Sequence, residues 1–158
     1  NHDQSDGVSK ANRLFRDAAE HIQAHANEPG MGEIRAKLLH YQGLIRYKQG
    51  LYGQAVRLLK EAQTYCDPDG LEAARLLDSL AVYFEQIGNF QRASQLLHDS
   101  LETKQKAGPE FELAITCQIL GRLYLLMDQL EEAGFYIEQA RGICAWLEDT
   151  KRYASLYN

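Results

Sequence analysis

The sequence contains few residues that stop helices and few that favour strands. Only three of its 158 residues are proline, Pro29, Pro68 and Pro109, and each lies between segments whose apolar residues recur with helical spacing. Leu, Ala, Glu and Gln are abundant, whereas β-branched residues are sparse. This composition predicts an all-α chain.

The sequence also lacks a dense basic run and a long apolar run. Its 17 lysines and arginines are scattered among 22 acidic residues, and the net charge is -5. Binding to a phosphate backbone requires a concentrated basic surface, so we expect no nucleic acid as a partner. A membrane-spanning helix requires about 20 consecutive apolar residues. No run approaches that length, so we expect no membrane partner either.

The sequence has few cysteines, and their spacing gives no sign of a paired motif. Cys66, Cys117 and Cys144 are odd in number and form no Cys-x-x-Cys motif. We expect them to be small buried apolar residues in a reducing compartment, and hence a cytoplasmic location. The first residues carry no secretory signal and no initial methionine. We therefore expect the chain to be a segment of a larger regulatory or scaffold protein.

Spacings that indicate catalysis or metal binding are nearly absent. His21 and His25 are four residues apart, which could hold a metal, but Glu20 precedes them, unlike the His-Glu-x-x-His of zinc peptidases. No third ligand accompanies them. Glycine-rich phosphate loops and nucleophile elbows are also missing. We expect neither an enzyme nor a bound metal or cofactor.

What the sequence does contain is a repeat. Apolar residues with helical spacing predict helices over 10–26, 33–49, 51–66, 71–87, 90–106, 110–127 and 130–148. The breaks inside successive helix pairs fall at Gly50, Gly88 and Asp128, so the interval is first 38 and then 40 (88 − 50 = 38; 128 − 88 = 40). An alanine follows each break by five residues. Landmarks that keep their register over three units indicate a repeat protein.

These landmarks divide the chain, taken as a single domain of residues 1–158, into smaller parts. A leading helix covers 10–26, and repeats of a helix pair cover 33–69, 71–108 and 110–148. We expect a new segment over 150–158, which is either the start of a capping helix or a truncated further repeat.

The repeats resemble the tetratricopeptide repeat, whose pattern is W-x2-L-G-x2-Y followed by A-x3-F, A and P. The matching residues of the first helices are Leu39 and Gly43, then Leu77, Leu80, Ala81 and Phe84, then Cys117, Leu120, Gly121 and Tyr124. Those of the second helices are Tyr52, Ala55, Leu59 and Ala62, then Phe90, Ala93, Leu97 and Ser100, then Leu130, Ala133, Ile137 and Ala140. The period exceeds the standard one of about 34 residues, and the large aromatic residue early in the first helix is missing.

The resemblance extends from Glu33 to Glu148 and implies an α-solenoid of antiparallel helix pairs wound into a right-handed superhelix. It also implies a non-catalytic protein–protein interaction module that binds a peptide or partner segment in a concave groove lined by the first helices. The residues expected to line this groove lie on the first helices, away from their paired second helices: Lys37, His40, Tyr41, Leu44, Tyr47, Arg75, Asp78, Glu85, Gln118 and Arg122.

The character of these residues predicts the kind of ligand. Asp78 and Glu85 would repel a terminal carboxylate, whereas they suit a ligand that carries a positive charge, and Tyr41, Leu44 and Tyr47 suit an apolar feature. Two alternatives stay open. The chain could instead be a regulatory domain that senses a small ligand or signalling peptide, or a structural spacer or oligomerisation element. Self-association as a homodimer through an exposed end of the solenoid is a further expectation.

Overall fold

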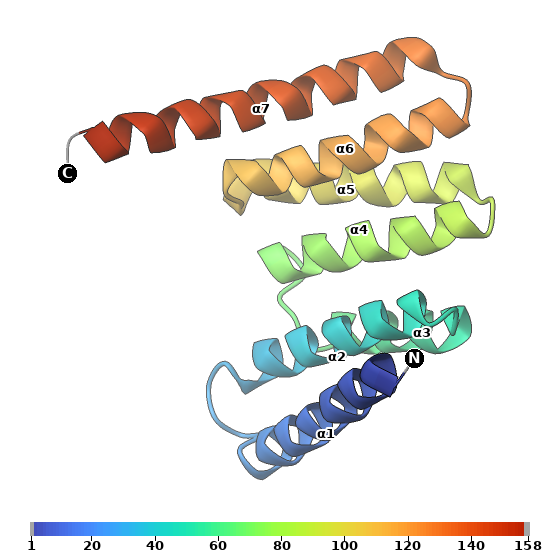
Figure 1. Cartoon of the computed structure of the whole chain (residues 1–158), viewed down its shortest axis with the longest axis vertical. Coiled ribbons are helices and arrows are strands. Elements are labelled where there is room, and N and C mark those ends of the chain that lie inside the picture. Colours follow the sequence, from blue (N-terminus) through green and yellow to red (C-terminus); the bar gives the residue numbers. More distant parts are fainter. Residues whose placement is uncertain (1, 157–158) are drawn as a thin grey trace. The chain divides into compact units, whose positions relative to one another are not determined.

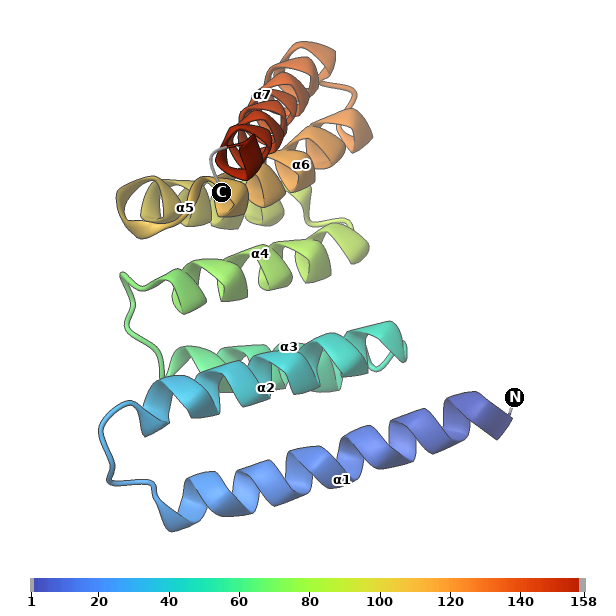
Figure 2. The ribbon, with the colours of Figure 1, turned by 60° about the vertical axis from the view of Figure 1, so that its left-hand side comes forward.

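A computed structural model describes the backbone of residues 2–156 and the side chains of residues 10, 13–106 and 108–148 (Figures 1 and 2). All regular structure in this part of the chain is helical. The helices are α1 (His2–Ala24), α2 (Met31–Lys48), α3 (Tyr52–Gln63), α4 (Leu71–Gln86), α5 (Phe90–Ala107), α6 (Glu110–Leu126) and α7 (Leu130–Leu156). They form two compact units, unit 1 with α1 to α3 and unit 2 with α4 to α7. Each unit is described by itself.

Unit 1 is built on the antiparallel pair α2 and α3, with α1 packed against α2. Gly50 turns the chain between α2 and α3 with a φ of +76°, in the left-handed region that favours glycine. The N–H of Leu51 donates to the carbonyl of Arg46 at 2.9 Å, and that of Gly50 donates to Tyr47 at 2.9 Å. These two bonds form a Schellman motif, so the turn satisfies the last carbonyls of α2.

Unit 2 contains the antiparallel pairs α4 with α5 and α6 with α7, and α6 also packs against α4 and α5 (Figure 1). The turns repeat the motif of unit 1. Gly88 has a φ of +77°, and Asp128 has a φ of +59°. Aspartate tolerates the left-handed region better than most residues, which explains how this turn forms without glycine. All-α architecture, antiparallel pairing and the three turns are therefore confirmed.

Small residues allow the paired helices to approach closely. Gly43 and Gly121 occupy equivalent places in their repeats, as do Ala55 and Ala133 (121 − 43 = 78; 133 − 55 = 78). Both alanines are fully buried. A Cβ added at Gly43 would lie 3.0 Å from Leu59 Cδ2 and 3.4 Å from the carbonyl oxygen of Ala55, so a larger residue would have to displace Leu59 in the packing of α2 on α3.

Two predicted helix boundaries are wrong. The leading helix begins at His2 rather than at residue 10, because nothing in its polar first residues stops a helix apart from the tolerated Gly7. The last helix does not end near 148: α7 continues through Thr150 to Leu156, so no separate segment begins there. No proline or glycine lies between residues 143 and 158, which removes the residues that normally end a helix.

The cysteines differ in their surroundings. Cys117 is buried, as predicted, and burial raises the pKa of its thiol. Cys66 is half-buried. Cys144 is exposed on α7, so its predicted burial is wrong. Within the described residues, no helix has the length and apolar character needed to cross a membrane.

Candidate functional site

One face of α6 exposes large apolar side chains. Phe111, Ile115 and Leu125 are 46, 43 and 50% exposed, and the side chains of Gln118 and Arg122 between them are also exposed. Their spacing of i, i+4, i+7, i+11 and i+14 places all five on one side of the helix. We call these five residues the α6 strip.

The equivalent face of α4 is covered by α6. Arg75 donates from Nε and Nη2 to Glu112 Oε1 at 2.8 and 2.5 Å. Near the other end of the same face, Arg122 Nη2 donates to Glu85 Oε2 at 2.9 Å. The structure thus brings together three of the residues predicted to bind a partner, Arg75, Glu85 and Arg122, at the contact between two first helices.

The repeat interval shows what the α6 strip corresponds to. Gly121 on α6 is the equivalent of Ala81 on α4 (121 − 81 = 40), so Arg75, Asp78 and Glu85 of α4 correspond to strip positions 115, 118 and 125. On α4 these positions receive a helix, namely α6. On α6 they are exposed. The α6 strip is therefore a surface of the kind on which unit 2 elsewhere packs a helix.

Asp78 lies inside a buried polar cluster. The ammonium of Lys104, whose side chain is fully buried, donates to Asp78 Oδ2 at 2.5 Å and to Thr116 Oγ1 at 2.9 Å. It also lies 3.3 Å from Glu112 Oε2. Thr116 in turn donates to the Asp78 carboxylate. The expectation that Asp78 faces a groove is wrong, because a counter-ion from α5 holds it in the interior.

The same cluster shifts the acid–base behaviour of Glu112. Burial raises the pKa of this carboxyl, but the hydrogen bond from Arg75 and the charge of Lys104 outweigh burial and hold the pKa below its ordinary value. The pKa of Arg75 is raised, chiefly by the hydrogen bond to Glu112, so the guanidinium stays charged. Both shifts stabilise the ion pair that joins α4 to α6.

Replacing Arg75 with glutamine should make the free energy of unfolding depend less steeply on pH in the acid range. A carboxyl whose pKa is lowered by folding contributes stability that is present above its ordinary pKa, here 4.5, and is lost as the pH falls through the folded value. In Arg75→Gln the pKa of Glu112 should rise, so less stability remains to be lost. The free energy of unfolding, measured in urea at several pH values below and above 4.5, should fall less steeply with decreasing pH for the variant than for the wild type.

The matched control is Arg122→Gln, which also removes a pair between α4 and α6. Arg122 is 54% exposed, so water screens its interaction with Glu85. This variant should keep the acid dependence of the wild type. An unchanged slope in Arg75→Gln would show that Glu112 does not titrate as described.

The predicted residues of unit 1 all lie on α2, but only some are available to a partner. Tyr41 is exposed, and Leu44 and Tyr47 are half-buried. Lys37 forms an ion pair within its own helix. His40 is buried, so its expected presentation to a ligand is wrong.

Sequence reasoning missed Phe111 and Ile115. Gln118 is a predicted residue of α6, and the same helical spacing, continued one and two turns toward the N-terminus, leads to both missed residues. That spacing is the signal that could have found them.

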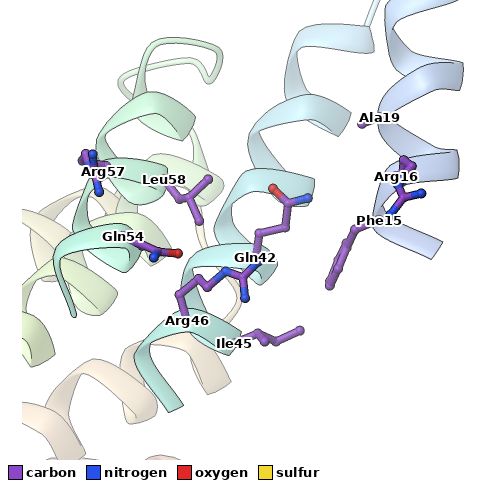
Figure 3. A pocket seen from close by; sticks show the side chains of 9 residues that line it. All are labelled: Phe15, Arg16, Ala19, Gln42, Ile45, Arg46, Gln54, Arg57 and Leu58. Carbon is purple, nitrogen blue, oxygen red and sulfur yellow. The ribbon is translucent and has the colours of Figure 1, made fainter. Parts of the chain in front are cut away.

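A second surface lies in unit 1, where α1, α2 and α3 enclose a trough of about 700 Å³ (Figure 3). In Figure 3, Phe15 reaches from α1 toward Gln42 and Ile45 of α2. The residues that line the trough are Phe15, Arg16, Ala19, Gln42, Ile45, Arg46, Gln54, Arg57 and Leu58.

The histidine pair expected not to bind a metal lies at the end of α1, with His21 in its last turn and His25 just after it. The rings of His21 and His25 are 4.5 Å apart between centroids, and His25 Nδ1 lies 2.8 Å from Glu28 Oε1. Among the side chains that the structure describes, no group of three or more His, Cys, Asp or Glu is arranged to hold a metal ion.

Comparison with solved structures identifies relatives in fold. A crystal structure of BtubC (BKLC) from P. vanneervenii matches with a TM-score of 0.72 and 17% identity over 89% of this chain. The chain spans 59% of the length of that protein. The N-terminal domain of stress-induced protein-1 (STI-1) from C. elegans matches with a TM-score of 0.60 and 16% identity, over 80% of this chain and 98% of that domain. At these identities the likeness shows the fold alone.

Comparison of sequences gives the family. No match was found among curated proteins. The family model described as "Tetratricopeptide repeat" matches residues 34–106, which include the first two helix pairs. The chain therefore contains tetratricopeptide repeats over residues 34–106, and domains built from this repeat generally act as protein–protein interaction modules.

Proposed function

We propose that the chain binds a helical segment of a partner protein on the α6 strip, and that this binding is its function, without catalysis. The observation that carries the proposal is the alignment of three exposed apolar side chains, Phe111, Ile115 and Leu125, on one helix face. Large exposed apolar side chains gathered on one face, with polar residues beside them, are typical of an interaction site. Gln118 and Arg122, two of the residues expected from the sequence, belong to the same face.

The form of the partner follows from the packing inside unit 2. The corresponding face of α4 binds α6, which lies along it as a helix. A partner helix on the α6 strip would make an equivalent contact, with apolar anchors in place of the ion pairs of Arg75 and Glu85. Amphipathic helices that fill such faces contact them with residues at i, i+3, i+4 and i+7.

The strip offers the kind of apolar anchors that support specific binding. Full burial of a Phe, Ile or Leu side chain contributes about 1.5–3 kcal/mol, and binding energy usually concentrates in a few such anchors. Ile115 lies between Phe111 and Gln118, so a charge at this position should disturb the whole contact.

The test is binding of a displayed library of amphipathic helices of about 25 residues with a randomised apolar face. Helices enriched on the wild-type chain should bind Ile115→Asp about 30-fold more weakly, which corresponds to about 2 kcal/mol. The measurement is the dissociation constant of each enriched helix for both chains.

The matched control is Ile87→Asp, which makes the same substitution at an isoleucine that is 54% exposed at the end of α4. The enriched helices should bind this variant as tightly as the wild type. Equal binding to Ile115→Asp and the wild type, or a library that yields no binders, would contradict the proposal.

A further inference from the structure

We propose that the trough of unit 1 is a second binding site, which takes an acidic peptide segment anchored by one apolar side chain. It shares no residue with the α6 strip. Its arginines favour a negatively charged ligand, whereas Asp78 and Glu85 led us to expect a positively charged one. Three observations support it: arginines without carboxylate partners, a different construction of the corresponding junction in unit 2, and apolar residues beside the charges.

The charge comes from three arginines on three different helices, Arg16 on α1, Arg46 on α2 and Arg57 on α3. Arg46 Nη1 donates to Gln49 Oε1 at 2.9 Å, and Arg57 Nε donates to the carbonyl of Gly53 at 3.1 Å. Among the described side chains, none of the three is ion-paired with a carboxylate, and no acidic residue lines the trough.

Among the described side chains, Arg92 of α5 is also without a carboxylate partner, but the three arginines of unit 1 line one trough together. The sequence has 22 acidic residues against 17 basic ones. Elsewhere Arg75, Arg122 and Arg141 each pair with a glutamate. Three arginines that line one trough whose lining includes no carboxylate should give it a positive potential in an otherwise acidic protein. Guanidinium is also the side-chain group best suited to bind carboxylates through paired hydrogen bonds.

The corresponding junction of unit 2 shows that the fold does not require these charges. In the register that aligns Gly43 with Gly121, Arg46 corresponds to Tyr124 and Leu58 to Tyr136. These tyrosines stack with centroids 5.6 Å apart and ring planes 7° apart. Tyr124 Oη also lies 3.0 Å from His98 Nε2. Unit 2 also has a hollow of about 500 Å³ beside Tyr124 and His98, but among the described residues no arginine, lysine or carboxylate lines it. The contrast with unit 1 is therefore one of charge, because arginines line the trough only in unit 1 of these two junctions.

The trough also offers an apolar surface. Phe15, Ile45 and Leu58 line it and are half-buried, so they provide contacts without being sealed in the core. Its volume of about 700 Å³ lies in the range of sites that bury most of a ligand of several hundred daltons. A short peptide with glutamate or aspartate on either side of a leucine or phenylalanine matches this distribution of charge and apolar area.

The experiment is NMR titration of the ¹⁵N-labelled chain with a pool of seven-residue peptides that alternate Glu or Asp with Leu or Phe. The Nε–Hε signals of Arg16, Arg46 and Arg57 should shift on addition of the pool at millimolar concentration. The triple variant Arg16→Gln, Arg46→Gln, Arg57→Gln should lower the affinity at least tenfold. A pool in which Lys replaces the acidic residues should cause no shift at these positions.

Further controls separate charge, apolar anchor and location. Arg92→Gln removes an arginine of α5 whose Nη1 donates to Gln95 Oε1 at 2.7 Å, and this variant should leave the affinity within twofold. Peptides with Ser in place of Leu and Phe should bind at least fivefold more weakly. Because Gln118 reports on the α6 strip, its side-chain amide should not move. Unshifted arginine signals, equal affinity in the triple variant, or equal loss in Arg92→Gln would overturn the proposal.

Discussion

Replacing Lys104 with methionine should destabilise unit 2 by about 3–5 kcal/mol. Methionine keeps most of the volume of the lysine side chain, so the main change is the loss of a fully buried positive charge. Asp78 and Glu112 would then keep their negative charges in the interior with one counter-ion fewer. Removing one partner of a buried ion pair costs much more than the pair contributes, because the remaining charge is neither hydrated nor compensated.

The measurement is urea unfolding followed by the fluorescence of Trp146, the only tryptophan of the chain, which lies on α7. Lys106→Met is the matched control on the same helix, since Lys106 pairs with Glu102 at 2.7 Å and both side chains are largely exposed. Because water screens such a pair, this variant should leave the urea midpoint nearly unchanged. The double variant Lys104→Met, Asp78→Leu should be more stable than Lys104→Met alone, because it removes the uncompensated carboxylate. Equal losses for the Lys104 and Lys106 variants would refute the account of the cluster.

Replacing Gly121 with leucine should destabilise unit 2 by about 3 kcal/mol, because α6 and α7 meet at this residue. Even a Cβ at this position would lie 2.7 Å from Ile137 Cγ1 and 3.4 Å from the carbonyl oxygen of Ala133. A leucine side chain would separate the two helices or force Ile137 out of its rotamer. The loss should appear in urea unfolding as a lower midpoint with a similar slope.

Gly134→Leu is the control, and its expected effect on stability is opposite to that of Gly121→Leu. Gly134 lies inside α7, and a Cβ added there meets nothing within 4 Å. Leucine should therefore stabilise the helix by about 0.5–1 kcal/mol, since glycine has a lower helix propensity. Similar stabilities of the Gly121 and Gly134 variants would show that the close approach of α6 to α7 does not restrict the size of the residue at position 121.

Much of the fold could be predicted because its signals are local. A glycine turn and an alanine five residues later both reflect backbone constraints that act within a few residues, and they recur with each repeat. The third turn has Asp128 in place of glycine, but its position could still be predicted from the repeat interval. The extent of α7 could not be inferred from the repeat, because the family pattern ends before the helix does.

The candidate site was less predictable because burial depends on residues far apart in sequence. Asp78 has the spacing of a groove residue, but it is buried against Lys104 of α5 and Thr116 of α6, which the spacing within α4 does not reveal. Nothing in the sequence singles out Arg46 and Arg57, because their position with Arg16 in the lining of one trough depends on how three helices pack. A one-dimensional pattern identifies a helix face but not the side chains that another helix brings to it.

The Lys104 cluster also bears on the order of the repeats. The positions equivalent to Lys104 in the other two helix pairs are Cys66 and Cys144 (104 − 38 = 66; 104 + 40 = 144), neither of which can serve as a buried cation. In a nearest-neighbour description, each repeat contributes its own folding term and a coupling term to the next repeat. Here the coupling between the pair α4–α5 and the pair α6–α7 includes the contacts of a lysine that only one pair carries. The pairs are therefore not interchangeable modules. If the pair α2–α3 followed the pair α4–α5, Ile34 and Leu38 would take the places of Glu112 and Thr116 beside Lys104 (112 − 34 = 78; 116 − 38 = 78).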